Sequence, residues 1–305
     1  MTRYNAVTRY TAAAGFLLCF ALCPVPAVGQ SPARPLRIEQ AEGAIRVYRE
    51  GDNPAILTQN ALPDKRPYLH PIVAPDGKGV ITEYRPAHHL HQTGIFWGFK
   101  LVNGRDFFMQ WQSEHYRRVS ATVIEPKGQR VRWQTVYMLD ENGNTAMTET
   151  QNWSMAESGG RYVLDLEWKG VPKTDMTLGK WYVGGLFVRM PWHMGSRAEA
   201  VTARGQRGQN AEQQRAEWTD VGIQVEGRDD LAHIVIFDHP DNYGSPVPWR
   251  VDSQMGFGPN TEPVERRLEK GKTEVFRYRL IAYTGDFDAV GMTRAWKEFV
   301  REKQP

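Results

Sequence analysis

The chain has almost no cysteine. Both of its cysteines, Cys19 and Cys23, lie close to the N-terminus. Neither fits a lipoprotein signal, because Leu18 and Leu22 precede them where a small residue is needed. If this N-terminal segment is removed, the mature chain has no disulfide, no thiolate metal ligand and no cysteine nucleophile. Its stability must then come from a hydrophobic core, which a chain of this length can bury.

The N-terminal segment itself predicts a signal peptide. Arg3 and Arg9 provide a positive start, and the apolar run 12–23 has signal-peptide length. Ala27 and Gly29 place small residues at the −3 and −1 positions of a cleavage site before residue 30. We therefore expect residues 1–29 to be cleaved, residues 30–305 to form the mature protein, and the protein to be periplasmic or secreted.

The mature sequence also lacks a charge excess and a second long apolar run. Without Arg3 and Arg9, 36 basic residues face 35 acidic ones. A net charge this close to zero argues against nucleic acid or an anionic membrane as a partner. No other stretch of about 20 apolar residues is present, so we expect a soluble protein without a membrane partner after cleavage.

Familiar catalytic motifs are absent as well. The sequence has no GxSxG elbow, no HExxH helix, no P-loop and no dinucleotide fingerprint. Acidic residues are plentiful, but no pair can be assigned as a glycosidase dyad, because that assignment depends on their separation in space.

Helical periodicity is scarce and strand periodicity is abundant. Only 287–303 places apolar residues at helical spacing. Alternating apolar and polar residues predict strands in the segments 36–48, 95–102, 117–124, 130–139, 145–153, 162–168, 181–190, 216–225, 233–237 and 273–283. We expect Glu42-Gly43 and Lys127-Gly128 to be turns, and the polar stretch 196–214 to be an exposed loop or lid. The pattern predicts an all-β protein, a large antiparallel β-sandwich with a C-terminal helix, in a single domain over 30–305.

Histidines are concentrated in one short segment. His88, His89 and His91 lie just before an apolar run, and the whole chain has eight histidines. In an extended segment His89 and His91 point to one side and His88 to the other. Histidine serves as acid, base or metal ligand near neutral pH. We therefore predict a site containing His89, His91 and Gln92, with a solvated polar loop as the alternative.

The chemistry of this site stays open between two possibilities. A divalent metal would need a third ligand, and His70 or His239 could provide it. Without metal, His89 and His91 would act as general acid and base on a polyhydroxylated ligand.

A proline-containing segment and an Asn-Gly turn supply further candidates. Arg66 and His70 lie between prolines that stiffen an extended path, which suits a binding site or a structural corner. Asp106 follows an Asn-Gly turn and would either bind substrate or stabilise that turn.

The segment Phe237–Tyr243 ends an apolar strand with Asp-His-Pro. We expect Asp238 to orient His239, His239 to be catalytic, and Asn242 to bind substrate. Trp249 follows shortly afterwards and would stack on a sugar ring.

Four blocks of the sequence resemble a known family of exported bacterial proteins. The blocks are RPYLHPIVAPDGKGVITEYRP, HHLHQTGIFWGFKLVNGRDFF, WTDVGIQVEG and FDHPDNYGSPVPWRV. The family is DUF6807, often labelled "methane oxygenase PmoA", and the resemblance runs from about residue 36 to 300. Many members have Asp-His-Pro-His-His-Arg-Gly where this chain has His88–Gly94, so His89 and His91 keep the pattern while His88 replaces the Asp. The oxygenase label does not fit, because that membrane subunit is a bundle of transmembrane helices.

The resemblance implies a β-sandwich, similar to the mutarotase-like supersandwich, with a carbohydrate-related function. We therefore predict an exported carbohydrate-active enzyme, of the epimerase, lyase or hydrolase type, that uses His89, His91 and His239 for proton transfer. Two alternatives remain: a non-catalytic glycan-binding module, and a metal-dependent enzyme with a site at the same three histidines. In each case the partner is a carbohydrate or glycoside.

Overall fold

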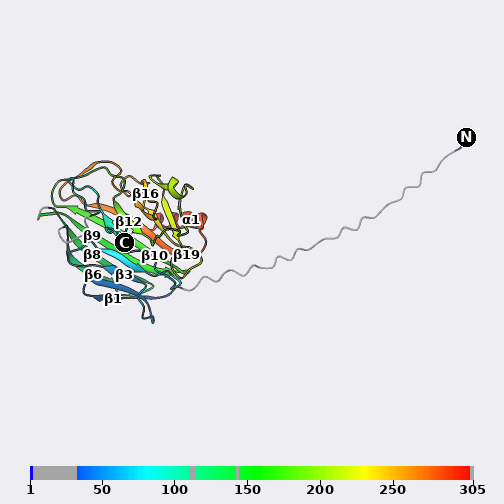
Figure 1. The fold of residues 1–305 in the computed structure, drawn as a ribbon, viewed down its shortest axis with the longest axis horizontal. Coiled ribbons are helices and arrows are strands. Elements are labelled where there is room, and N and C mark those ends of the chain that lie inside the picture. The colour runs from blue at the N-terminus through cyan, green and yellow to red at the C-terminus, as the bar shows by residue number, and fades with distance from the viewer. Residues whose placement is uncertain (3–32, 110–114, 142–143, 303–305) are drawn as a thin grey trace. The chain divides into compact units, whose positions relative to one another are not determined.

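The computed structural model describes residues 1–2, 33–109, 115–141 and 144–302 (Figure 1). Contacts group the described residues from 33 onwards into one compact unit. The signal peptide predicted for residues 1–29 falls almost wholly outside the described residues and stays a prediction. In the described part of the chain, no helix is long and apolar enough to cross a membrane.

The described residues form two large antiparallel sheets. The first sheet runs β16 (Trp249–Val251), β17 (Gly256–Pro259), β12 (Gly185–Arg189), β5 (Ile95–Gly98), β4 (Tyr68–Ile72), β3 (Leu57–Asn60), β2 (Ala44–Arg49), β1 (Leu36–Ala41) and β7 (Lys127–Gly128). The second sheet runs β13 (Ala198–Thr202), β14 (Trp218–Ile223), β15 (Ala232–Asp238), β19 (Glu274–Thr284), β10 (Arg161–Pro172), β9 (Asn144–Ser158), β8 (Arg130–Glu141) and β6 (Tyr116–Glu125). A small third sheet pairs β11 (Met176–Leu178) with β18 (Arg266–Leu268). Figure 1 shows β8, β9 and β10 side by side in the second sheet.

The two large sheets pack face to face over one core. In β10, buried and half-buried residues alternate along all 12 residues, as expected of a strand with one face on a core. Across the sandwich, the rings of Trp97 in β5 and Trp168 in β10 stack with centroids 4.3 Å apart. Gln59 in β3 accepts a hydrogen bond from the Trp133 indole in β8, at 3.1 Å. The predicted antiparallel β-sandwich is confirmed.

A C-terminal helix covers part of the second sheet. Helix α1 (Ala289–Arg301) begins after Asp288, whose side chain accepts a hydrogen bond from Gly291 N at 2.9 Å and so caps the first turn. Met292 and Phe299 pack with apolar residues of β14, β15 and β19 in a second hydrophobic cluster. Because both faces of β15 are covered, all seven of its residues are buried. The predicted helix is confirmed with slightly narrower bounds.

One local prediction was wrong. The polar stretch 196–214 is not simply a loop. It contains β13, an edge strand paired with β14, and the 3₁₀ helix η1 (Gly208–Ala211). Strand β13 is only five residues long and is flanked mostly by polar residues, so the composition of the whole stretch did not reveal it. The turn predicted at Lys127-Gly128 lies where the chain reverses between β6 and β8, and these two residues also pair with β1 as the short strand β7.

Candidate functional site

A cavity of about 490 Å³ lies against the first sheet, on the side away from the main core. Its floor rests on Phe96, Phe108 and Phe187, which belong to a small cluster separate from that core. Phe96 takes this side because Trp97, the next residue in β5, points into the core and strand neighbours alternate. The cavity is lined by Ala87, His88, His89, Leu90, His91, Gln92, Lys100, Phe108, Met109, Trp181, Tyr182, Val183, Phe187, Arg250 and Asp252.

The segment containing the three histidines folds as two successive tight turns. His89 N donates to Pro86 O at 2.8 Å, and Gln92 N donates to His89 O at 3.0 Å. Because the segment is turned rather than extended, His88 does not point away from its neighbours. All three histidines line the same cavity, and the prediction that His88 would be separate was wrong.

The imidazoles are close enough to share protons. The Nδ1 atoms of His88 and His89 are 2.7 Å apart, so one of them donates and the other accepts. The rings of His89 and His91 lie edge to face with centroids 5.6 Å apart. Burial lowers the pKa of His89, and Arg189 lowers it further. Burial, with Arg66 as the next cause, lowers the pKa of His91 to about 4. Both rings are therefore neutral near pH 7 and able to accept a proton.

Arg66 supports the histidine loop from below and does not face the cavity. Its guanidinium is fully buried, 3.7 Å from the centre of the Phe96 ring. It donates to the backbone oxygens of Phe108 and His91, each at 2.7 Å. Burial lowers the pKa of Arg66 to about 10, which leaves it charged at neutral pH. The expectation that Arg66 binds a substrate is corrected, because Arg66 is absent from the described cavity lining and both of its Nη atoms bond backbone oxygens.

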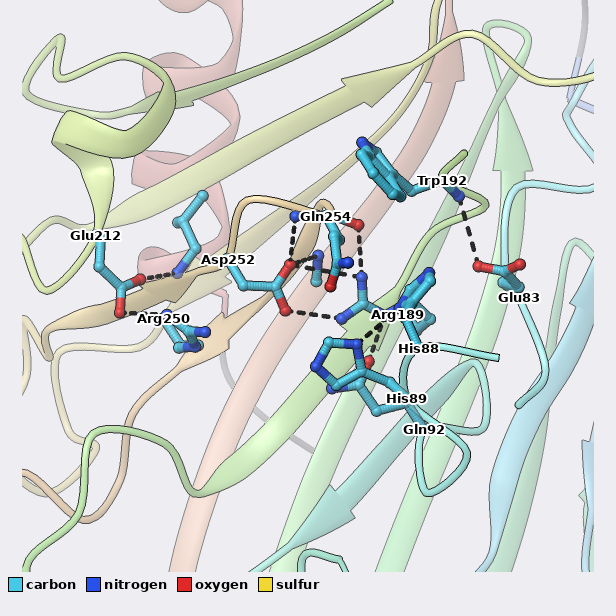
Figure 2. Close-up of polar contacts among 12 residues, drawn as sticks. Glu83, His88, His89, Gln92, Arg189, Trp192, Glu212, Arg250, Asp252 and Gln254 are labelled. Atoms are coloured by element: carbon cyan, nitrogen blue, oxygen red, sulfur yellow. Dashed lines mark hydrogen bonds and ion pairs between the residues drawn. The ribbon is translucent and has the colours of Figure 1, made fainter. Parts of the chain in front are cut away.

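A second buried arginine holds the other side of the loop (Figure 2). Arg189, at the end of β12, is fully buried and pairs with Asp252, with Nη2 and Oδ2 2.7 Å apart. It also donates to Gln92 Oε1 and to the carbonyl of Gln254. Burial would raise the pKa of Asp252, but Arg189 and backbone amides lower it below its usual value. Gln92 is therefore a link between this ion pair and the loop, although it also borders the cavity.

Gly94 fixes the end of the histidine loop. Its φ is +78°, in the left-handed region that favours glycine. A Cβ at this position would collide with the backbone oxygen of Leu69 in β4. Its own carbonyl accepts a hydrogen bond from Arg189 N at 2.8 Å. The glycine of the His-x-His-x-x-Gly pattern thus lets the loop pack directly against the sheet.

Two aromatic side chains line the cavity together with the histidines. Trp181 and Tyr182 are 38% and 51% exposed, and their ring centroids lie 5.6 Å apart. Lys100 lies 5.6 Å from the Trp181 ring centre, and Arg250 lies 5.2 Å from that of Tyr182. Sequence reasoning missed both aromatic residues, because 181–190 read as one continuous strand. The adjacent Trp-Tyr pair before a Gly-Gly was the available signal.

Asp106 and His70 lie near the cavity but do not line it. Asp106 pairs with Lys100, and its Oδ1 accepts from Phe108 N and Met109 N at 2.9 and 2.8 Å. Asp106 therefore stabilises a turn, which is the second of the two roles that the sequence predicted for it. His70, in β4, is hydrogen-bonded to Thr82 Oγ1 at 3.0 Å and packs against Tyr84. Burial lowers the pKa of His70 to about 4.

The Asp238–Asn242 segment is a structural junction. Asp238 accepts hydrogen bonds from Ser245 Oγ at 2.7 Å and from Asn242 Nδ2 at 2.8 Å. Asn242 also bonds the backbone N and O of Arg277. Asp238 therefore does not orient His239, whose ring packs on Phe299 of α1 with centroids 5.3 Å apart.

These contacts correct the predictions for three residues. His239, Asn242 and Trp249 are absent from the described lining of the histidine cavity. Trp249 is 0% exposed, and its indole nitrogen donates to Ala216 O at 2.9 Å, so its ring is part of the core and cannot stack on a sugar. Among the described residues, no three His, Cys, Asp or Glu side chains are grouped so that they could hold a metal ion. A site built from His89, His91 and His239 therefore does not fit this arrangement.

Comparisons with solved structures give weak similarities. A polysaccharide lyase matches with a TM-score of 0.38 and 11% identity, over 87% of this chain and 34% of that one. The GH36 α-galactosidase AgaA from Geobacillus stearothermophilus matches with a TM-score of 0.35 and 14% identity, over 82% and 40%. An α-galactosidase from Lactobacillus brevis matches with a TM-score of 0.35 and 9% identity, over 82% and 39%. The chain thus spans less than half the length of each.

Comparison with curated proteins found no match. The model of one family, described as a family of unknown function (DUF6807), matches residues 47–297. This range runs from β2 into α1 and includes the histidine loop, the aromatic pair and the Arg189–Asp252 pair. The chain belongs to the DUF6807 family.

Proposed function

We propose that the histidine cavity binds a carbohydrate and that His89 and His91 transfer a proton on it. The observation that carries this proposal is that exposed Trp181 and Tyr182 line the same cavity as the histidines. Exposed aromatic faces are apolar and flat and so match the C–H faces of sugar rings. The volume, about 490 Å³, lies within the usual range for small-ligand sites.

The histidines suit proton transfer because burial keeps them neutral. A neutral imidazole accepts a proton from a hydroxyl group or from an acidic carbon, and it can return that proton later in the reaction. Because both His89 and His91 start neutral, one ring first accepts a proton, and the imidazolium so formed is the group that delivers it in the later step. This chemistry is shared by epimerases, lyases and some hydrolases. An exported location, which the N-terminal sequence predicts, belongs to the same proposal.

The test is a glycan array with the purified protein, followed by calorimetry and by product analysis of each bound sugar. Trp181→Ala should weaken binding by about tenfold or more, whereas Tyr243→Ala should not. Tyr243 is a matched control because it is 45% exposed and outside the described cavity lining. His89→Ala should lower turnover by about 10²–10⁴-fold, with the exposed His193→Ala as its control.

Each outcome has a defined meaning. Binding and turnover that depend on Trp181 and His89 support the proposal. Binding without turnover would leave a glycan-binding module and remove the catalytic role of the histidines. Absence of binding to every sugar would overturn the proposal.

A further inference from the structure

Both cationic side chains in the described lining of the cavity, Lys100 and Arg250, have a carboxylate partner. Lys100 pairs with Asp106, Arg250 with Glu212. Arg189 pairs with Asp252, itself part of the wall. Figure 2 shows the Arg250–Glu212 pair at the left and the Arg189–Asp252 pair in the centre, with His88 and His89 beside Arg189.

The two cations that line the cavity are held in place from both sides. The Lys100 side chain is 13% exposed and that of Arg250 is 24% exposed. Each lies between a carboxylate and an aromatic ring, Trp181 for Lys100 and Tyr182 for Arg250. This geometry uses the cations to support the aromatic pair through cation–π contacts. Their charge is neutralised by carboxylates that do not line the cavity.

A charged ligand would meet an unfavourable environment here. To pair with Lys100 or Arg250, the carboxylate of an anionic sugar would have to displace Asp106 or Glu212. If it did not displace that carboxylate, it would lie beside it and be repelled by its negative charge. It would also approach Asp252, the carboxylate that lines the cavity. Removing a carboxylate from water without a new cationic partner is costly, whereas a neutral sugar loses only hydroxyl hydration.

We infer that the cavity selects uncharged sugar units over uronic acids and other anionic sugars. The inference rests on the proposed carbohydrate function and specifies its substrate class. Selectivity comes from carboxylates placed behind the cations and not from a lack of cations. Asp106 and Glu212 are therefore specificity-determining residues, although neither belongs to the described cavity lining.

The experiment compares matched pairs of probes that differ only at C6. Calorimetry would measure glucose against glucuronate, galactose against galacturonate and mannose against mannuronate, first as monosaccharides and then as short oligosaccharides. We expect the neutral member to bind about tenfold more tightly or better in the pair that fits the site. Its affinity should be unchanged between low and high salt, because no ion pair is formed with the ligand.

Two variants test the mechanism of selection. Glu212→Gln keeps an acceptor oxygen for Val251 N but leaves Arg250 without its carboxylate. It should raise affinity for the uronate by about three- to tenfold and leave the neutral sugar unchanged. Asp106→Asn should act in the same way through Lys100, while its Oδ1 still caps the turn. Glu199→Gln, in a surface pair with Arg207, is the control and should change neither affinity.

The outcomes separate this inference from the proposed function. Tighter binding of a uronate by the wild-type protein, with strong salt dependence, would overturn the inference and leave carbohydrate binding intact. Uronate affinity that stays the same in Glu212→Gln and Asp106→Asn would also overturn it. If no member of any pair binds, the proposed function itself fails.

Discussion

Two segments of this protein look alike in sequence and differ completely in their surroundings. The histidine loop, 88–91, and the junction, 238–242, both contain histidine, sit beside proline and adjoin buried strands. In the loop, the supporting hydrogen bonds are made by the backbone and by Gln92. In the junction, the side chains of Asp238 and Asn242 make the bonds themselves.

The difference shows under which condition a polar side chain remains available to contact a ligand. The loop is anchored by Arg66 and Arg189, which lie beneath it and bond its carbonyl and amide groups. Its imidazoles are then left to line a cavity. In the junction, the side chains of Asp238 and Asn242 are instead used in bonds to Ser245 and to the backbone of Arg277 in β19. Buried polar groups must find partners, and here the partners are internal.

The largest expected effect comes from breaking the anchor of the histidine loop. Arg189→Met should lower the free energy of unfolding by about 3–5 kcal/mol, because Asp252 would remain buried without its cation. Urea unfolding would measure the change. Arg207→Met, in the exposed pair with Glu199, should change stability by less than about 1 kcal/mol. Equal stability of wild type and Arg189→Met would show that the loop does not depend on this pair.

A somewhat smaller effect is expected at the junction. Asp238→Ala should lower the free energy of unfolding by about 1–3 kcal/mol, because it removes the hydrogen bonds that Asn242 and Ser245 donate to this buried carboxylate. Sugar affinity should not change. Asp241→Ala, at a neighbouring side chain that is 74% exposed, is the control. If folded Asp238→Ala lost sugar binding, the separation between the two segments would be wrong.

The two segments should also respond to pH in opposite directions. Burial raises the pKa of Asp238 to about 6, so the folded state binds this proton more tightly than the unfolded state does. The contribution of Asp238 to the free energy of unfolding therefore falls as pH rises from about 4 to 6. Burial lowers the pKa of His91 to about 4, so the unfolded state binds more protons and this contribution rises between about pH 4 and 6.5. Relative to wild type, Asp238→Asn should make the slope of stability against pH more positive, and His91→Gln should make it less positive. Unfolding curves at several pH values would show whether either slope changes with the opposite sign.

The smallest effect on stability is expected at the cavity wall itself. His89→Ala should change the free energy of unfolding by less than about 0.5 kcal/mol, because its ring borders a cavity and its main-chain bonds remain. The same variant should strongly lower turnover. Thermal unfolding beside an activity assay would separate the two, and a large loss of stability would make His89 a structural residue like Asp238.

Much of the fold could be predicted from sequence because strand periodicity is local. The hairpin of β1 and β2 turns at Gly43, whose φ is +73°, as its Glu-Gly pair indicated. The regular alternation of β10 and the apolar spacing of α1 likewise appear in consecutive residues. Strand β13 was missed because its five residues lie within a stretch that is otherwise mostly polar and reads as a loop.

The candidate site could be predicted only in part. The density of histidines drew attention to 88–91, and the structure places that loop on a cavity. Trp181, Arg250 and Asp252 were missed because they lie in two segments far from the histidines in the chain and belong to no recognised motif. Conversely, Trp249 was predicted to stack on a sugar because sequence does not reveal which tryptophans lie in the core.

The sequence by itself determined the alternation of the long strands, the presence of the last helix and which short loop concentrates histidine. These properties follow from side-chain spacing and backbone preference within a few residues. Only the tertiary structure decided that Gln92 would meet Arg189, that Asp252 would neutralise it and that the aromatic pair would line the cavity with the histidines. Those contacts join strands far apart in the chain, and which polar side chain finds an internal partner depends on what the folded sheets bring beside it.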